Sequence, residues 1–279
     1  MSGDSKCAKR QSVVVTGGAS GLGLAMTQHF ASRGHRITVV DVNVDSGLTA
    51  VSEVSAQYPQ ATLSFKKCDV SSWQEQATVF KEIYQEHGAI DIVMANAGIS
   101  EQGATSLALT DEEEPSQPRL KVLDINLTGT IYSVKLAMHY MRKNAANPST
   151  GSRGSIICTA SNAGLYPFPV APLYSASKGG VIMLVRSVAK ILESVNIQIN
   201  ALAPAVLESN IAPKDLFKDM KITPTSTLIK GVKKILENPD ISGTVAEIHG
   251  EEPTIRPHHE YVDDDTKANL ENFWSLGFA

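Results

Sequence analysis

The chain has 279 residues, of which 42% are apolar, enough to bury a full hydrophobic core as one large domain or two small ones. Its formal net charge of -4 and the lack of a dense Lys/Arg run give no reason to expect nucleic acid or an anionic membrane as a partner. Three widely spaced cysteines favour neither a disulfide framework nor a metal site, and they fit a reducing compartment best. The first residues form no apolar leader, and no stretch is apolar for long enough to span a bilayer, so we expect a cytoplasmic protein.

Strands and helices alternate after a polar N-terminal segment, residues 1–11, that we expect to be flexible. Apolar or β-branched runs predict strands at 13–15, 37–40, 62–67, 90–98, 155–160, 197–201 and 240–248. Patterns of helical period predict helices at 24–30, 44–57, 71–87, 120–142, 174–193 and 224–236. Such alternation favours a parallel sheet covered by helices on both faces, with ligands at the carboxyl ends of its strands.

A glycine turn joins the first predicted strand to the first predicted helix. Gly17, Gly21 and Gly23 follow the spacing Gly-x-x-x-Gly-x-Gly. Without Cβ atoms the backbone can turn tightly and approach a phosphate, and the following helix offers its N-terminal amides to an anion. The alternative is an ordinary glycine-rich turn between a strand and a helix.

Asp41 ends the second predicted strand, where a carboxylate can accept both hydroxyls of an adenosine ribose and would repel a 2′-phosphate. No Arg or Lys lies in the glycine turn or directly after Asp41. These features favour NAD over NADP as the cofactor. Asp41 could also simply begin the turn that follows the strand.

Tyr174 and Lys178 lie one helical turn apart on a predicted helix, so that a phenol and an ammonium group can act on one substrate. A neighbouring positive charge stabilises phenolate and moves its pKa toward neutrality, which would make Tyr174 a useful acid/base group. The same spacing also occurs by chance in many helices. Ser161 ends the preceding strand, and Asn96-Ala97-Gly98 ends an earlier one.

Taken together, these motifs resemble the short-chain dehydrogenase/reductase family in order and spacing, over about residues 12 to 248. The general layout of this sequence and its Asp41 look most like the NAD-dependent branch of the family, which includes 15-hydroxyprostaglandin dehydrogenase. The resemblance implies an α/β fold with one Rossmann-like domain, a three-layer, doubly wound parallel sheet of about seven strands, and a tail (residues 249–279) that packs on the domain or a partner subunit. The motifs that carry it are Thr16-Gly17-x-x-x-Gly21-x-Gly23, Asp69-Val70, Asn96-Ala97-Gly98, Asn126, Ser161, Tyr174-x-x-x-Lys178 and Asn200-Ala201-x-Ala203-Pro204.

The resemblance also implies a role for each site residue. Tyr174 would be the general base or acid, Lys178 would lower the pKa of Tyr174 and hold the nicotinamide ribose, Ser161 would bond the reacting oxygen, and Asn126 would hold a water in the proton path. No metal is expected, and a homodimer or homotetramer is implied. The cofactor would lie against Gly17, Ser20, Gly21, Leu22, Gly23, Asp41, Asp69, Val70, Asn96, Ala97, Gly98, Tyr174, Lys178, Leu207 and Ser209.

Two residues depart from the family pattern: Ala205 stands where glycine is usual and Ser209 where threonine is usual. Ala205 is tolerated if its φ is negative, and Ser209 keeps the hydroxyl. Residues 211–223 would form a substrate lid, and Tyr166 and Phe168 suggest a small lipophilic substrate. The alternative for these two side chains is simple packing of their loop against the core. We therefore expect an NAD(P)-dependent oxidoreductase acting on a secondary alcohol or ketone, in specialised metabolism. The alternatives are a non-redox isomerase or cyclase and a cofactor-sensing interaction protein.

Overall fold

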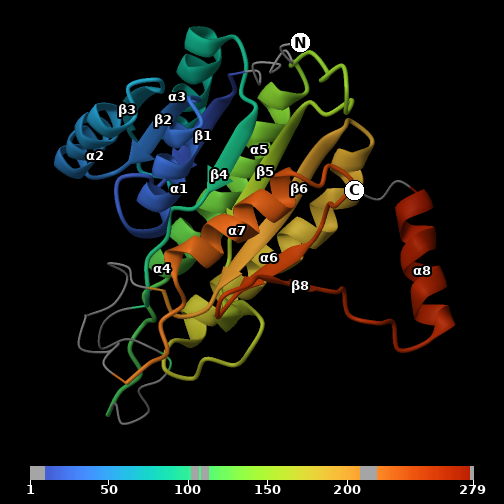
Figure 1. Ribbon diagram of the computed structural model, residues 1–279. Helices are drawn as coiled ribbons and strands as arrows, with labels where there is room; N and C mark the ends of the chain where they lie inside the picture. The colour runs from blue at the N-terminus through green and yellow to red at the C-terminus, as the bar shows by residue number, and fades with distance from the viewer. Residues whose placement is uncertain (1–9, 102–106, 108–112, 208–218, 277–279) are drawn as a thin grey trace.

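The computed structural model describes residues 10–101, 107, 113–207 and 219–276. Within these ranges it forms one eight-stranded sheet between two layers of helices (Figure 1). The strands are β1 (Ser12–Thr16), β2 (Arg36–Asp41), β3 (Thr62–Lys67), β4 (Ile92–Ala95), β5 (Gly154–Thr159), β6 (Ile197–Pro204), β7 (Val245–Ile248) and β8 (Thr254–Arg256). The helices are α1 (Gly21–Ser32), α2 (Val44–Gln57), α3 (Trp73–His87), α4 (Lys121–Leu123), the π-turn η1 (Asp124–Thr128), α5 (Gly129–Met141), the 3₁₀ turn η2 (Asn162–Gly164), α6 (Pro172–Glu193), α7 (Thr225–Leu236) and α8 (Asp264–Ser275).

The sheet order is β3-β2-β1-β4-β5-β6-β7-β8, and every pairing is parallel except that of β7 with β8. The predicted doubly wound parallel sheet is therefore confirmed, and an antiparallel eighth strand extends it into the segment that we expected to be a tail. The strand order reverses between β1 and β4. Ligands of open α/β sheets bind at the carboxyl ends of the strands beside such a reversal.

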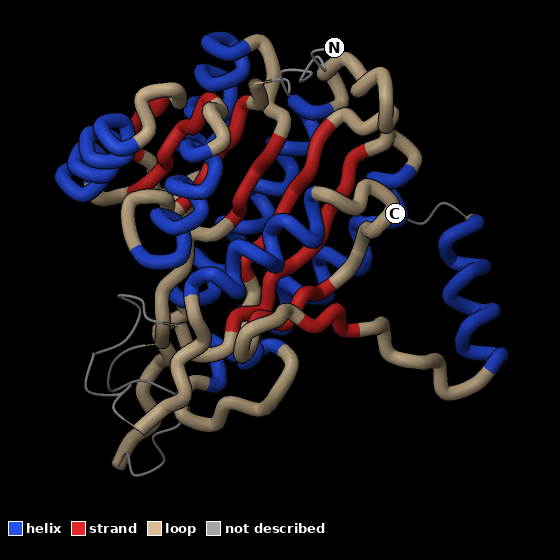
Figure 2. The backbone as a smooth tube through the Cα atoms, in the orientation of Figure 1, coloured by secondary structure: helices blue, strands red, loops and turns tan. Residues whose placement is uncertain are grey.

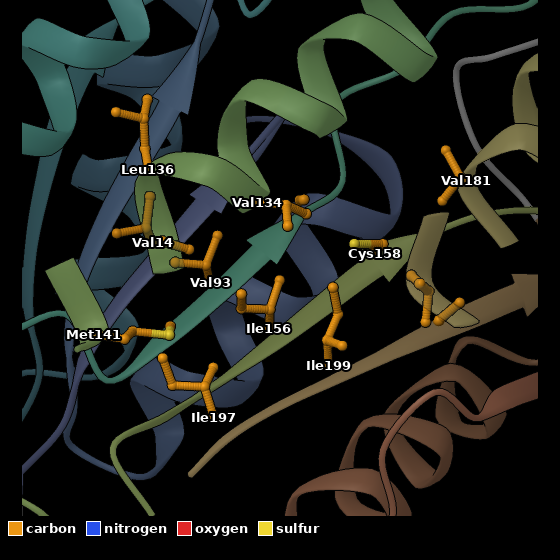
Figure 3. Packing of buried hydrophobic residues seen from close by; sticks show 14 of the residues in the cluster. Val14, Val93, Val134, Leu136, Met141, Ile156, Cys158, Val181, Ile197 and Ile199 are labelled. Atoms are coloured by element: carbon orange, nitrogen blue, oxygen red, sulfur yellow. The ribbon is translucent and has the colours of Figure 1, made fainter. Parts of the chain in front are cut away.

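Alternating strand residues supply two separate cores, one on each face of the sheet. Val13 and Val15 of β1 pack with α1, α2 and α7, whereas Val14 faces α3, α5 and α6. Each of these valines is fully buried. Figure 3 shows the second core, in which side chains from neighbouring strands form a continuous apolar layer, among them Val14, Val93, Ile156 and Ile199.

The long helix predicted over 120–142 is interrupted. The π-turn η1 separates α4 from α5, and Asn126 lies inside it. The Thr130 hydroxyl donates to the Asn126 carbonyl at 2.7 Å. A side chain therefore satisfies a backbone carbonyl in the π-turn, where the regular helical hydrogen-bond pattern is interrupted. Such single wide turns are frequent at functional sites because they turn a side chain away from the helical register.

Two strands are shorter than predicted: β4 occupies only 92–95 of 90–98, and β7 only 245–248 of 240–248. In the second case Gly243 has a φ of 72°, a left-handed conformation that an extended strand does not accommodate. Past β8 the backbone runs out to α8, which lies outside the two helix layers that cover the sheet (Figure 2).

The packing of the tail on the domain or on a partner subunit stays a prediction, and its described aromatic residues lie at the surface of the single chain. Phe273 and Trp274 are exposed, and α8 has no buried residue in the described part of the chain. Lys190 of α6 lies over the Trp274 ring at 5.1 Å from its centroid, while Phe278 lies outside the described residues. None of the helices that the structure describes is both long enough and apolar enough to cross a membrane.

Gln76 joins α3 to the sheet and to α5 through a buried set of hydrogen bonds. Its side-chain amide donates to the carbonyls of Val70 at 2.6 Å and Gly129 at 2.9 Å, and its amide oxygen accepts from the Ser133 hydroxyl at 2.8 Å. Since Gln76 is only 1% exposed, no water can replace these partners easily.

We expect Gln76→Leu to lower the free energy of unfolding by about 1–3 kcal/mol, because the buried Val70 carbonyl loses its bond from Gln76, while the Gly129 carbonyl and the Ser133 hydroxyl keep only the bond between them. Urea denaturation measures the change. The matched control is Gln74→Leu on the exposed face of the same helix, which should stay within about 0.5 kcal/mol of the parent. Equal effects of the two substitutions would contradict this interpretation.

Candidate active site

The candidate site begins where the carboxyl ends of β1, β4 and β5 meet. Asn96, directly after β4, braces the glycine turn: its amide nitrogen donates to the carbonyl of Thr16 at 3.1 Å, and its amide oxygen accepts from Thr159 at 3.0 Å. The Thr16 hydroxyl in turn accepts from the backbone N–H groups of Asn96 at 2.9 Å and Ala97 at 3.1 Å. Asn96 thus joins the ends of neighbouring strands and supports the glycine turn.

The glycine turn has the shape that a phosphate requires. Gly17 and Gly21 have φ values of 62° and 51°, in the left-handed region that favours glycine. A Cβ on Gly23 would lie 2.0 Å from the Gly17 carbonyl oxygen, so the helix can begin this close to the turn only with glycine there. Ser20 is the N-cap residue of α1, yet its side chain makes no capping bond in the described structure, and the first turn holds no acidic residue. The helix N-terminus is therefore able to receive an anion.

Asp41 lies beside this turn, at the end of β2. One of its carboxylate oxygens accepts from the Ala19 N–H at 3.2 Å, and the other accepts from the Asn43 N–H at 3.1 Å. A shallow hollow lies between the glycine turn and α2, and its described lining contains acidic but no basic side chains: Ala19, Ser20, Gly21, Leu24, Asp45, Ser46, Thr49, Ala50 and Glu53. A 2′-phosphate on an adenosine placed here would meet negative charge.

Asp69 and Val70 follow β3 at the same edge of the sheet. The Asp69 carboxylate accepts from the Ser71 hydroxyl at 2.7 Å and from its N–H at 2.9 Å, and these bonds, the hydroxyl first, hold the pKa of Asp69 below its usual value. The Asp69 N–H donates to Glu75 at 2.9 Å, and Val70 is buried. Both residues, which the sequence predicts to contact the cofactor, are thus held in fixed positions.

Gly98, Asn126 and Lys178 meet at one point in the interior. A Cβ built on Gly98 would lie 3.2 Å from the Asn126 amide oxygen and 3.3 Å from the Lys178 Nζ, so glycine keeps a small space between two polar groups. The Asn126 side chain accepts from the Ile99 N–H at 2.8 Å, and donates to the Ile99 carbonyl at 2.9 Å and to the Ser177 hydroxyl at 3.1 Å. Asn126 itself is fully buried.

Ser161, Tyr174 and Lys178 are brought together by η2 and the first turns of α6. The Ser161 hydroxyl accepts from the Ala163 N–H at 3.1 Å, and the Ser175 hydroxyl donates to the Ala163 carbonyl, so the turn after β5 is tied to α6. Lys178 Nζ donates to the Thr159 carbonyl at 2.8 Å and lies 5.7 Å from the centroid of the Tyr174 ring. The predicted acid/base constellation is therefore assembled in space.

Burial dominates the titration of these groups. It lowers the pKa of Lys178 to about 8, and it raises the pKa of the Tyr174 phenol, while a hydrogen bond with Ser161 acts in the opposite direction. Lys178 was expected to lower the pKa of Tyr174, but it is not among the groups that shift this pKa, which burial raises. Cys158, next to Lys178, has its thiol pKa raised to about 12 by burial, so it remains a neutral core residue.

The strand end at β6 completes the site in part. Ala205 is not among the described residues with positive φ, so an alanine is compatible with the backbone at this position. Its N–H donates to the Ile248 carbonyl at 2.9 Å. Leu207 is buried. Ser209 and most of the predicted lid, 211–223, lie outside the described residues.

Two contacts at the site were not predicted from the sequence. Glu101 accepts hydrogen bonds from the N–H groups of Leu173 and Tyr174, and the Tyr166 hydroxyl donates to Glu247 at 3.1 Å. Each joins residues more than seventy positions apart, so no local spacing could have revealed them. The one available signal was the lack of a polar residue at the N-cap of α6, which calls for an acceptor from elsewhere. Within the described ranges no cluster of three or more metal-ligating side chains occurs.

The sequence and the fold both match known proteins. The family model described as short chain dehydrogenase matches residues 11–219. The short-chain dehydrogenase/reductase prx4 of Penicillium roqueforti is 39% identical over 206 residues, which cover 73% of this chain and 56% of that protein, so the match spans a little over half of this relative. Human 15-hydroxyprostaglandin dehydrogenase [NAD(+)] is 30% identical over 256 residues, covering 84% of this chain and 89% of that enzyme.

A solved structure supports the fold independently. A short-chain type dehydrogenase/reductase from Mycobacterium ulcerans superposes with a TM-score of 0.75 at 21% identity, covering 88% of this chain and 92% of that one. The family model covers most of the chain, and the site motifs lie together at the carboxyl ends of the strands. The chain belongs to the short-chain dehydrogenase/reductase family.

Proposed function

We propose that this protein is an NAD-dependent oxidoreductase that transfers a hydride between the nicotinamide and a secondary alcohol or ketone of a small lipophilic molecule. The observation that carries the proposal is the buried meeting of Lys178 and Asn126 with the Tyr174 phenol and Ser161, next to a glycine turn shaped for a pyrophosphate. A buried lysine is costly to keep, and titratable groups whose pKa is strongly shifted gather at functional sites.

The residues divide the chemistry of alcohol oxidation among them. Tyr174 removes the hydroxyl proton of the substrate, and Ser161 donates a hydrogen bond to the same oxygen as negative charge builds on it. Lys178 places positive charge near the phenol, and Asn126 orders the interior between Gly98 and α6 through which a proton can leave. Bound NAD supplies the hydride acceptor. In ketone reduction each residue acts in the reverse sense.

The preference for NAD rests on Asp41 and its surroundings. The carboxylate lies at the glycine turn, and the neighbouring hollow contains Asp45 and Glu53. A 2′-phosphate would lose favourable contacts with solvent and gain repulsion, whereas two ribose hydroxyls can donate to Asp41. The name of the human relative specifies NAD(+), in agreement with this proposal.

A lipophilic substrate is supported by the loop between η2 and α6. Tyr166, Phe168 and Val170 are exposed there, beside Tyr174, and the Tyr166 hydroxyl is held by Glu247. Exposed apolar side chains next to a catalytic group favour a ligand with a ring or a long chain. We also propose that the protein is a homodimer or homotetramer, since Ile131 and Met183 are exposed on α5 and α6.

The cofactor preference is tested by fluorescence titration with NADH and, separately, with NADPH. We expect NADH to bind at least about tenfold more tightly, and Asp41→Asn to reduce that ratio by about tenfold because the ribose loses a charged acceptor. Asp265→Asn on the exposed side of α8 is the matched control. Tighter binding of NADPH would contradict the role of Asp41, and binding of neither nucleotide would contradict the proposed function.

The catalytic role of Tyr174 is tested with Tyr174→Phe and a panel of lipophilic secondary alcohols in the presence of NAD. We expect turnover to fall by about 10²–10⁴-fold, with NADH affinity within about twofold of the parent, because only the proton-transferring hydroxyl is removed. Tyr84→Phe on α3 is the control and should keep full activity. Undiminished turnover by Tyr174→Phe would rule out the assignment.

The cost of burying Lys178 predicts a pH-dependent stability. Its folded pKa of about 8 is below the ordinary 10.5, so between these values the unfolded chain binds more protons and stability rises with pH. Lys178→Met should therefore be more stable than the parent at pH 7, by an amount on the order of 1–3 kcal/mol, with the difference shrinking from pH 8 toward 10.5.

Thermal and urea unfolding of both proteins across this pH range measure the difference. Lys190→Met, at an exposed position of the same helix, is the control and should show no such pH dependence. A constant difference between parent and Lys178→Met at every pH would show that the ammonium is not desolvated in the folded protein.

A further inference from the structure

The helix that carries the catalytic tyrosine has no cap of its own. The N-cap residue of α6 is Ala171, whose side chain cannot accept a hydrogen bond, and the first helical residue is Pro172, which has no N–H. The N–H groups of Leu173 and Tyr174 therefore need an acceptor from another part of the chain. In α2, α3 and α8, by contrast, the N-cap side chain accepts a bond from its own first turn: Asn43, Ser72 and Asp263.

Glu101 supplies the missing acceptor across the site. Its Oε2 accepts from the Leu173 N–H at 2.8 Å and from the Tyr174 N–H at 3.2 Å. A carboxylate at a helix N-terminus is stabilised both by these charge-assisted bonds and by the helix dipole. One oxygen atom thus satisfies the backbone of the catalytic residue and of its neighbour.

The position of Glu101 is itself fixed by another residue of the site. Two positions earlier, Ile99 exchanges two hydrogen bonds with the Asn126 side chain, at 2.8 and 2.9 Å. The stretch 99–101 is therefore fastened at one end to Asn126 and at the other to the backbone of Tyr174. This stretch therefore links the end of β4 both to the turn η1, which holds Asn126, and to the first turn of α6.

We propose that Glu101 is a positioning residue for the reaction: by capping α6 it holds the Tyr174 phenol in register with Ser161 and with Lys178, one turn further along. This inference rests on the proposed function. An error of about 1 Å in the position of a reacting group can cost about a hundredfold in rate, so a cap at the base of the tyrosine affects turnover more than cofactor binding. A cap of purely structural importance would affect stability alone.

The test compares Glu101→Ala, Glu101→Gln and the parent. Glu101→Ala should speed hydrogen exchange at the Leu173 and Tyr174 amides by about tenfold and lower kcat by about ten- to a hundredfold. KM for the alcohol and the affinity for NADH should stay within about twofold. Glu101→Gln keeps an oxygen acceptor without the charge, so it should recover most of the lost kcat.

Asp263→Ala is the matched control, because it also removes a carboxylate that caps a helix, with its Oδ1 2.7 Å from the Thr266 N–H. It should speed exchange at Thr266 and leave kcat unchanged. If the parent is active, unchanged hydrogen exchange at the Leu173 and Tyr174 amides or unchanged kcat in Glu101→Ala contradicts the role of Glu101 but not the proposed function. A parent that turns over no alcohol contradicts the proposed function and this role with it.

Discussion

The ammonium group of Lys178 is the constraint on which the rest of the site depends. It is 3% exposed, and a charge in such a place is tolerated only where polar atoms are fixed around it. The Thr159 carbonyl at the end of β5 accepts a hydrogen bond from it, and the Asn126 side chain lies across the small space that Gly98 leaves open. A side chain in place of Gly98 would fill that space. The register of α6, the end of β5 and the wide turn η1 must therefore all agree before the lysine can be accommodated.

The folded sheet makes that agreement possible. Strands β1, β4 and β5 are neighbours, so their carboxyl ends bring the glycine turn, Asn96 and Thr159 together although they are far apart in the sequence. The two cores hold the sheet from both faces, which makes these strand ends rigid. Rigid strand ends suit a reaction in which a proton and a hydride must move over short, fixed distances.

The sequence predicted what depends on local pattern. Strand and helix alternation, the glycine turn and the spacing of Tyr174 and Lys178 each reflect a period or a backbone requirement that a few neighbouring residues express. It did not predict the π-turn at Asn126, since a widened turn has no distinct hydrophobic period, nor β8, a three-residue strand whose pairing is decided by the sheet edge. The raised pKa of Tyr174 was also not predicted, because it depends on how deeply the fold buries the phenol.

The two helix N-termini at the site differ in whether a side chain of the protein caps them. That of α1 has no side-chain cap among the described residues and no acidic residue in its first turn, so its amides are available to an anionic ligand. That of α6 is occupied by Glu101, so its amides are already satisfied by the protein's own negative charge. An anionic group would therefore be drawn to the glycine turn and not to the first turn of α6. This difference supports the proposed binding of a pyrophosphate at the glycine turn and of an uncharged substrate beside Tyr174.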